Sequence, residues 1–376
     1  MAKLAWDFLY DGTDDITAKV LSFNITYGRT QYLDQYPGGR LTLTINNAND
    51  YANGLVYGKI ITVTSDNAAY GQFHNAYWIE QITYDDYPGG VGLNTATIVA
   101  ADWIARAGRV YANALSLPAF TTVDQFKYFE ASAGGPLPSD MAIGSSASSS
   151  VAAATTYSGT ITNYMNLLNT TERGYVQTRG TVLYLIGRPA INNYLPISTT
   201  LGRTTSSTQI AYQDFRRIEA GQQYINTATI QPGAVAAQTA INSTSLSLYG
   251  PAYYSSATVD NDTTQALGNA QWVVSSFGDP NVLRFELSFT DVAQNATALT
   301  SYMTQCWGTF NRAINLSYTP PGGASTTVAC VIEGAQFEGT PAATNITLSL
   351  SPFAYYQFFT LNSATLGILD TSRLGW

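Results

Sequence analysis

The sequence predicts a mainly β protein with a few helices, made of two related small β-barrels that carry inserted α+β domains. Thr, Val, Ile, Tyr and Phe alternate with polar residues along most of the 376-residue chain, and clusters of Gly, Pro, Asn and Asp interrupt them. Hydrophobic residues make up 45% of the chain and aromatic residues 12%, which is enough for a sizeable core. The two ends of the chain also resemble each other, which indicates an internal duplication.

Two segments show the clearest strand pattern. The apolar side chains of residues 41–45 fall on one face, and those of residues 283–289 do the same with polar side chains opposite. Both are expected to be half-buried strands. Turns are expected at the Pro-Gly-Gly sequences at 37–39, 88–90 and 321–323, because Pro presets φ and Gly supplies a positive φ.

Three helices are expected, near residues 161–172, near 262–277 and around 103–114, because each carries an apolar stripe at helical spacing. The helix near 262–277 has the clearest start, since the side chain of Asp262 is suited to cap the first backbone N–H groups. The Ser- and Ala-rich segment 144–156 has little to bury and is expected to be an exposed connection or a mobile loop.

The duplication is most visible around two glutamates. Trp78-Ile79-Glu80-Gln81 aligns with Val331-Ile332-Glu333-Gly334 at an offset of 332 − 79 = 253. Further matches in the same order pair 59–64 with 313–318, 94–98 with 344–348, and 39–45 with 224–230.

These matches set the expected domain boundaries. The first barrel is expected at 1–118, and an intervening α+β domain at 119–215. The second barrel is expected to combine 216–245 with 310–376, and an inserted domain to occupy 246–309.

Composition and motifs exclude several functions. The 17 Lys and Arg residues against 25 Asp and Glu give a net charge of −8, which disfavours a protein that grips nucleic-acid phosphates. His74 is the only histidine and has no triad motif around it, and Cys306 and Cys330 are too few for a four-ligand zinc site. We therefore assign no catalytic, cofactor-binding or metal-ligating residue, expect no cofactor, and do not expect an enzyme. No run of about 20 apolar residues is present, so no membrane segment is expected.

Two alternatives to a purely structural role remain. Carboxylate pairs at Asp14/Asp15, Asp85/Asp86 and Asp260/Asp262 would suit a polysaccharide hydrolase, although neighbouring strand residues point to opposite faces. The many aromatic residues would suit either sugar stacking or protein–protein contacts. They include tryptophans at positions 78, 103, 272, 307 and 376.

Several segments resemble one protein family. Residues 25–34 (Ile-Thr-Tyr-Gly-Arg-Thr-Gln-Tyr-Leu-Asp) followed by 39–47, and the helix at 163–168, are similar to the central tail-tip or baseplate hub of long-tailed bacteriophages, a class of minor tail proteins. The ending at 367–376 is also similar to that family. Independently, Leu374 and Trp376 are expected to anchor this apolar end on the second barrel or on a neighbouring subunit, since such groups at a terminus are stabilised by burial.

The resemblance implies a structural protein of the virion tail, assembled in the host cytoplasm. It implies a homotrimer, with a hexamer as the alternative, whose barrels form a pseudo-sixfold ring joining the tail tube to the tip. The expected partners are the distal tail protein, the tape measure protein and tip or fibre proteins, while DNA passes through without specific binding. A carbohydrate-binding host-recognition tail protein is the competing function, and a cell-surface hydrolase is a third.

Overall fold

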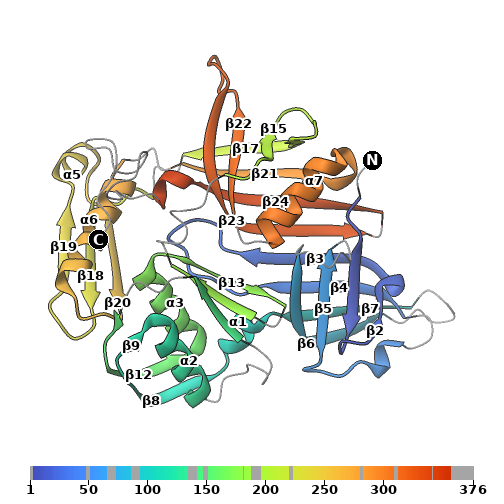
Figure 1. Cartoon of the computed structure of the whole chain (residues 1–376), viewed down its shortest axis with the longest axis horizontal. Helices are drawn as coiled ribbons and strands as arrows, with labels where there is room; N and C mark the ends of the chain where they lie inside the picture. Colours follow the sequence, from blue (N-terminus) through green and yellow to red (C-terminus); the bar gives the residue numbers. More distant parts are fainter. Residues whose placement is uncertain are drawn as a thin grey trace.

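The computed structural model describes residues 3–47, 51–65, 73–85, 94–133, 142–146, 151–180, 182–187, 196–219, 223–279, 283–308, 312–340 and 342–356. The prediction of a mainly β protein with a few helices is confirmed. Strands from both ends of the chain share one 14-stranded sheet within these ranges. Figure 1 shows the N-terminal strands, in blue, beside the C-terminal strands, in orange and red.

The N-terminal part of this sheet, which we call the first β unit, is antiparallel and half-buried. On β4 the side chains of Leu41, Leu43 and Ile45 are fully buried while Thr42 and Thr44 are only partly so, as the alternating pattern predicts. The strands lie in the order β2-β1-β5-β6-β7-β4-β3. Their bounds are β1 Trp6–Tyr10, β2 Asp14–Asp15, β3 Val20–Gly28, β4 Arg40–Asn46, β5 Ile60–Ser65, β6 His74–Asp85 and β7 Thr95–Ala101, with short 3-10 helices at Thr17–Lys19 and Tyr51–Gly54.

The second β unit is formed by later strands in the order β16-β15-β22-β23-β24-β21-β17. Helix α7 covers part of it, and its Tyr302 packs against Phe289 of β21 at 5.7 Å between ring centroids. The bounds are β15 Thr200–Gly202, β16 Gln209–Ala211, β17 Asp214–Glu219, β21 Leu283–Thr290, α7 Ala296–Tyr302, β22 Ala313–Tyr318, β23 Thr326–Thr340 and β24 Ala343–Pro352. A 3-10 helix at Asp291–Ala293, a π-helical turn at Met303–Gly308 and a 3-10 helix at Phe353–Tyr355 complete the unit.

The strand register confirms that the two units are related. Ile60 lies opposite Trp78 in the first unit, and Ala313 lies opposite Val331 in the second, so 313 − 60 and 331 − 78 both equal 253. The pairing of β6 with β7 shifts between Ile79 and Gln81, and that of β23 with β24 shifts between Ile332 and Gly334. Both bulges therefore fall on the two glutamates that the sequence aligns.

The predicted match of 39–45 with 224–230 is wrong. β4 pairs with β7 with Leu41 opposite Ala100, and its counterpart β21 pairs with β24 with Phe285 opposite Leu350. Residues 227–232 instead form β18 in a separate three-stranded sheet. Thr alternates with apolar residues in both segments, so the local pattern cannot distinguish them and only the strand pairing does.

The strand partners also differ from the expected boundaries at three places. Strands β15 and β16, with the start of β17, come from the expected domain 119–215, and β21 comes from the expected insertion 246–309, yet all four belong to the sheet of the second β unit. Strands β18 and β19, expected in the barrel segment 216–245, pair with each other, and β18 also pairs with β20, in a sheet separate from that of the second β unit. We therefore propose an insertion that spans 223–279.

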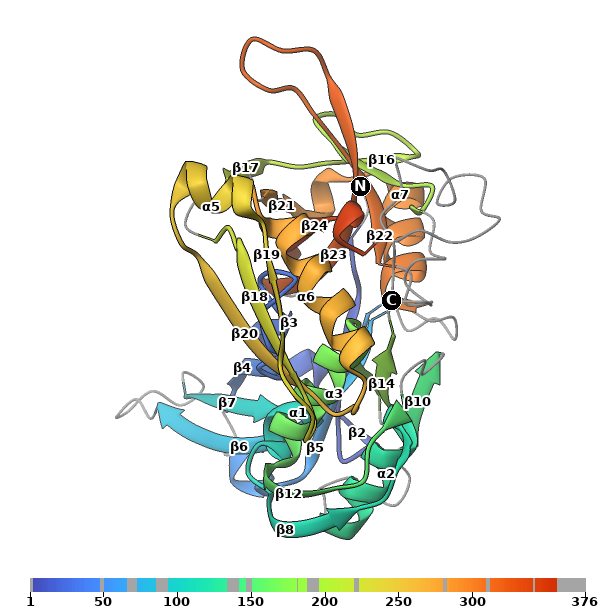
Figure 2. The same ribbon diagram turned by 90° about the vertical axis from the view of Figure 1, so that its left-hand side faces the viewer.

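The insertion and the intervening part supply most of the helices. Figure 2 shows α6 lying along the sheet of β18, β19 and β20. The insertion contains β18 Thr227–Pro232, β19 Gln238–Ile241, α5 Ser243–Tyr249, β20 Tyr253–Thr258 and α6 Thr263–Phe277. The intervening part contains α1 Trp103–Ala107, β8 Tyr111–Leu117, β9 Phe120–Thr121, α2 Thr122–Ala133, β10 Ala142–Ser146, β11 Val151–Ala152, β12 Thr155–Thr160, α3 Ile161–Glu172, β13 Tyr175–Arg179 and β14 Val182–Ile186. The two parts share one hydrophobic core.

Two helix predictions are confirmed. Helix α3 spans Ile161–Glu172, and α6 begins after Asp262, whose Oδ1 accepts hydrogen bonds from the N–H groups of Thr264 and Gln265 at 2.8 and 3.1 Å. The expected helix at 103–114 is wrong beyond Ala107, because β8 takes up the rest and pairs with β12.

Other local predictions have mixed outcomes. The turn at 321–323 is confirmed, with φ of +71° at Gly322. Residues 37–39 lie in the connection between β3 and β4 and Gly38 has a φ of +87°, but the turn of this connection lies earlier, where the Asp34 N–H donates to the Gln31 carbonyl at 3.1 Å. The described residues of 144–156 form parts of β10, β11 and β12 and not a simple exposed connection. The predicted turn at 88–90 and the C-terminal anchor of Leu374 and Trp376 lie outside the described residues.

Candidate functional site

The two β units are joined by direct strand pairing. β3 pairs antiparallel with β23 over Phe23–Gly28 and Gly334–Gly339. A Cβ atom on Gly28 would stand 2.2 Å from the carbonyl oxygen of Glu333, and one on Gly334 would stand 2.5 Å from that of Arg29. Glycine at both positions therefore permits the close approach of the two backbones.

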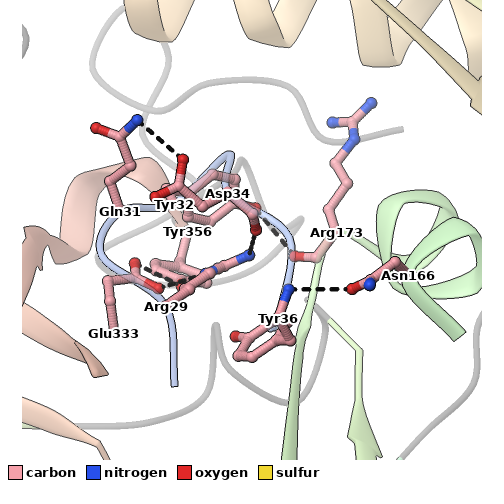
Figure 3. Close-up of polar contacts among 9 residues, drawn as sticks. All are labelled: Arg29, Gln31, Tyr32, Asp34, Tyr36, Asn166, Arg173, Glu333 and Tyr356. Carbon is pink, nitrogen blue, oxygen red and sulfur yellow. Dashed lines mark hydrogen bonds and ion pairs between the residues drawn. The ribbon is translucent and has the colours of Figure 1, made fainter. Parts of the chain in front are cut away.

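A buried polar cluster of Arg29, Glu333 and Tyr356 lies at the end of this pairing. The Arg29 Nε donates to Glu333 Oε2 at 2.8 Å, and Arg29 Nη2 donates to the Tyr356 hydroxyl at 2.9 Å. That hydroxyl donates in turn to Glu333 Oε1 at 2.8 Å, as Figure 3 shows. The Arg29 backbone N–H also donates to the Glu333 carbonyl at 3.1 Å. We call the β3–β23 pairing together with this cluster the inter-unit joint.

The charges of the joint are almost fully removed from water. The side chains of Arg29 and Glu333 are 3% and 1% exposed. Burial lowers the pKa of Arg29, but the Glu333 carboxylate together with Tyr36 and Tyr356 more than offsets it, so the pKa is raised well above its usual value. The guanidinium carbon also lies 5.0 Å from the ring centroid of Tyr32 and 4.7 Å from that of Tyr36. The cation is thus held by a carboxylate and two aromatic rings.

The loop after β3 ties the joint to the intervening part. The Tyr36 N–H donates to Asn166 Oδ1 on α3 at 3.1 Å, and the Tyr32 hydroxyl donates to the carbonyl of Arg173 at 3.0 Å. Arg173 ends α3 in the left-handed conformation, with φ of +51°. Its guanidinium lies 4.8 Å from the ring of Trp272 on α6. All four parts of the chain therefore meet around one loop.

The predicted carboxylate pairs are not brought together for hydrolysis. Asp14 and Asp15 are exposed on β2, and Asp85 is exposed at the end of β6. Asp260 is buried, accepts a hydrogen bond from Thr258 and has a raised pKa because of burial, while Asp262 caps α6. Asp86 lies outside the described residues.

The aromatic residues divide into core and surface. Trp78, Trp103, Trp272 and Trp307 are all buried, so they form core and not a stacking surface, and Trp376 lies outside the described residues. An open groove beside the joint is nevertheless lined by tyrosines, namely Tyr32, Tyr224, Tyr253 and Tyr355. Tyr253 is 76% exposed. The exposed ring of Tyr253 makes this groove suited to stack a planar or sugar ligand.

The remaining candidates for chemistry are dispersed. His74 lies on β6, where its carbonyl accepts a hydrogen bond from the Gly180 N–H. Cys306 and Cys330 are free and buried, and burial raises the pKa of both thiols. Over the ranges that the structure describes, no three His, Cys, Asp or Glu residues are grouped as metal ligands.

The sequence aligns Glu333 with Glu80 but does not reveal its partner. Arg29 and Glu333 are 304 residues apart, and Tyr356 gives no local signal of its contact with either. The sequence does contain one signal that such a partner exists. Glu333 is a charged residue within an otherwise apolar repeated segment, and a charged residue on a buried strand is expected to have a partner.

Comparisons with known proteins point to one kind of fold. No protein-family model matches the chain, and no curated protein matches it. Among solved structures, the tail protein from Neisseria meningitidis MC58 matches with a TM-score of 0.62 and 11% identity, over 94% of this chain and 98% of that chain. The chain has the fold of phage tail proteins.

Two further structures share this tail-protein fold. The 43 kDa tail protein of prophage MuSo2 from Shewanella oneidensis has a TM-score of 0.55 and 10% identity, over 95% of this chain and 98% of that chain. An E. coli component of the type VI secretion system has a TM-score of 0.50 and 8% identity, over 92% of this chain and 76% of that chain. That E. coli protein is described as structurally similar to the T4 bacteriophage tail proteins gp27 and gp5. None of the helices in the described ranges of this chain is long and apolar enough to cross a bilayer.

Proposed function

We propose that the chain is the central structural hub of a bacteriophage tail tip or baseplate. The observation that carries the proposal is the pair of β units with the same strand register, joined edge to edge by β23 and β3. The likeness of its fold to phage tail proteins supports the same role. The role is structural and not catalytic, and its site is the inter-unit joint that holds the two units in a fixed relation.

The duplication offers a physical means to join parts of different symmetry. Three chains with two similar units each present six similar surfaces, so a homotrimer meets both a sixfold tail tube and a threefold tip. A hexamer is the alternative. The net charge of −8 per chain suits a ring that lines the DNA channel, because an acidic surface repels the phosphates and lets DNA pass without specific binding. The proposed neighbours are the distal tail protein, the tape measure protein and tip or fibre proteins.

Labelling of assembled tails tests this proposal. An epitope inserted in the exposed turn at 321–323 and detected with gold-labelled antibody is expected to appear only at the tip of the tail in electron micrographs. The copy number per tail, measured by quantitative mass spectrometry against the tape measure protein, is expected to be three. Label along the length of the tail, or absence of the protein from purified tails, would contradict the proposal that the chain is the hub.

The tyrosine-lined groove favours a second candidate function, binding of a host-surface carbohydrate. Tyr224 and Tyr253 line the groove, Tyr253 is 76% exposed, and such rings are suited to stack sugar rings. If this function holds, Tyr253→Ala is expected to abolish adsorption of soluble protein to host cell-wall polysaccharide, whereas Tyr57→Ala, at an exposed tyrosine outside the groove, leaves it unchanged. Equal adsorption by both variants would remove this candidate.

A further inference from the structure

One strand edge of each β unit has a counterpart in the inter-unit joint. Phe23 of β3 lies opposite Leu43, and Phe215 of β17 lies opposite Leu287, so β17 is to β21 what β3 is to β4. In the same way β6 is the counterpart of β23. The joint inside the chain pairs β23 with β3. The equivalent pairing between the counterparts of these two strands would join β6 to β17.

In the part of the chain that the structure describes, neither of these two edges has a further strand partner. Within the described residues β17 pairs only with β21, and residues 81–85 of β6 pair only with β7. Figure 2 shows β17 near the top of the molecule and β6 near the bottom, so the two strands do not meet within one chain. A contact between them therefore needs a second copy. Open edges of this kind promote association with other strands unless they are covered.

We propose that β6 of one copy pairs antiparallel with β17 of the next copy, in the register of the inter-unit joint. Subtracting 253 from the β23 positions and adding 215 − 23 = 192 to the β3 positions gives the partners. They are Ile82 with Glu219, Thr83 with Ile218, Tyr84 with Arg217, and Asp85 with Arg216. The inference rests on the proposed ring and names the strands that close it.

The side chains at these positions are complementary. Thr83, Tyr84 and Asp85 are exposed on β6, and Arg216 and Arg217 are exposed on β17. The register places the Asp85 carboxylate opposite the Arg216 guanidinium and the Tyr84 ring opposite Arg217. β17 also carries Asp214 and Glu219, and Glu219 Oε1 lies 2.6 Å from Arg217 Nη2 within the strand. Pairing of β6 with β6 would give Asp85 no cation, because residues 81–85 carry none, whereas β17 offers Arg216.

The equivalent positions inside the chain are apolar. Phe337 and Ile25, the counterparts of Tyr84 and Arg217, are both fully buried. This difference is expected of two versions of one joint. The version inside a chain forms on folding and remains covered, whereas the version between chains is exposed to water before assembly and needs polar groups to stay soluble.

Cysteine cross-linking tests the register in the full-length protein. The Arg29 N–H donates to the Glu333 carbonyl, so the alternation of an antiparallel ladder places Gln336 and Thr26 at a non-hydrogen-bonded pair. Their counterparts Thr83 and Ile218 should have Cα atoms about 4.5 Å apart, within the range that a disulfide spans. The variant Thr83→Cys/Ile218→Cys is expected to form closed covalent oligomers on mild oxidation. The matched control Thr83→Cys/Arg217→Cys places its thiols on opposite faces and is expected not to.

Charge exchange tests the complementarity in the same assembly. Asp85→Arg and Arg216→Asp are each expected to weaken self-association at least tenfold in analytical ultracentrifugation, and the double variant is expected to restore it. Self-association without the Thr83–Ile218 cross-link, or with single exchanges that have no effect, would overturn the strand register while leaving the ring. If copies of the protein make no contact with one another, either in solution or in assembled tails, the proposed ring is wrong as well as the register.

Discussion

The same glutamate position is used in two different ways in the two β units. Glu333 is buried against Arg29 and Tyr356 in the inter-unit joint. Glu80, its counterpart, is itself only 11% exposed, but it contacts Arg109 at 2.6 Å and Arg40 at 3.8 Å, and both arginine side chains are more than half exposed, so the cations of these pairs stay in water. Exposed ion pairs contribute about 0–1 kcal/mol, whereas removing one partner of a buried pair costs about 3–5 kcal/mol.

Neutralising each glutamate should therefore give unequal results. Glu333→Gln is expected to lower the free energy of unfolding by about 3–5 kcal/mol, because it leaves the Arg29 charge buried without a carboxylate. Glu80→Gln is the matched control and is expected to cost less than about 1 kcal/mol. Urea denaturation followed by circular dichroism measures both. Similar losses of unfolding free energy in the two variants would show that Glu333 in the joint stabilises the protein no more than Glu80 does.

Asp102 should make stability depend on pH. Burial raises the pKa of this carboxyl to about 6, from an ordinary value of 3.8. The folded state therefore holds the proton more tightly, and the contribution of Asp102 is complete below the ordinary pKa and is lost as the pH rises through about 6. Asn at this position keeps an acceptor for the Ala105 N–H, which Asp102 now caps, and never ionises.

The free energy of unfolding of the Asp102→Asn variant should accordingly increase relative to that of the parent protein as the pH rises. Their difference in unfolding free energy is expected to widen by on the order of 2–3 kcal/mol between pH 4 and pH 6.5 and to stay constant above it. Urea titrations of both proteins across this range measure the difference, in which all other titrating groups cancel. Parallel curves would mean that Asp102 is not perturbed.

At the scale of elements, apolar stripes and caps within a segment predict its secondary structure correctly, except where pairing with a distant strand determines that structure. Helices α3 and α6 could be predicted because their apolar stripes and caps are contained within each segment. The segment 103–114 has the same kind of stripe, but residues from Tyr111 onward pair with β12, so the helix stops at Ala107. Helix α2 was missed although Thr121 and Asp124 form a capping pair at its start.

The glycines of the joint should be intolerant of substitution. Gly334→Ala is expected to destabilise the protein by about 1–3 kcal/mol or more, because the new methyl group would meet the carbonyl oxygens of Arg29 and Tyr27. Gly54 has open space around its Cα, so Gly54→Ala is expected to change stability by less than about 0.5 kcal/mol. Thermal unfolding of both variants provides the comparison. A neutral Gly334→Ala would mean that β3 and β23 are free to separate.

At the scale of the molecule, the fold class and the duplication could be predicted from the sequence, but the joint could not. The offset of 253 is kept from β5 to β6 and from β22 to β23 because the connection between these two strands has the same length in both units. The partner of Glu333 is set by the packing of strands that are distant in sequence, and periodicity carries no information on it. The contacts that bring the four parts of the chain together around Arg29 likewise depend on tertiary packing alone.

The two units should unfold together. One continuous hydrophobic core includes Ile25 and Leu43 of the first unit with Leu287 and Phe337 of the second. Hydrogen exchange measured by mass spectrometry is expected to give the same opening free energy for β4 and β24, and Glu333→Gln should lower both equally. Protection of β24 that persists after β4 has exchanged would show instead that the units are independent.

The pairing of β3 with β23 also governs how the chain must be made. Gly28 leaves the ribosome 334 − 28 = 306 residues before its partner Gly334. During that interval β3 has an open edge, and contacts between positions so far apart form late and slowly. At high rates of synthesis, the first β unit of one nascent chain is therefore exposed to the β23 segment of another. Exchange of that strand between chains is the misassembly to which this architecture is most vulnerable.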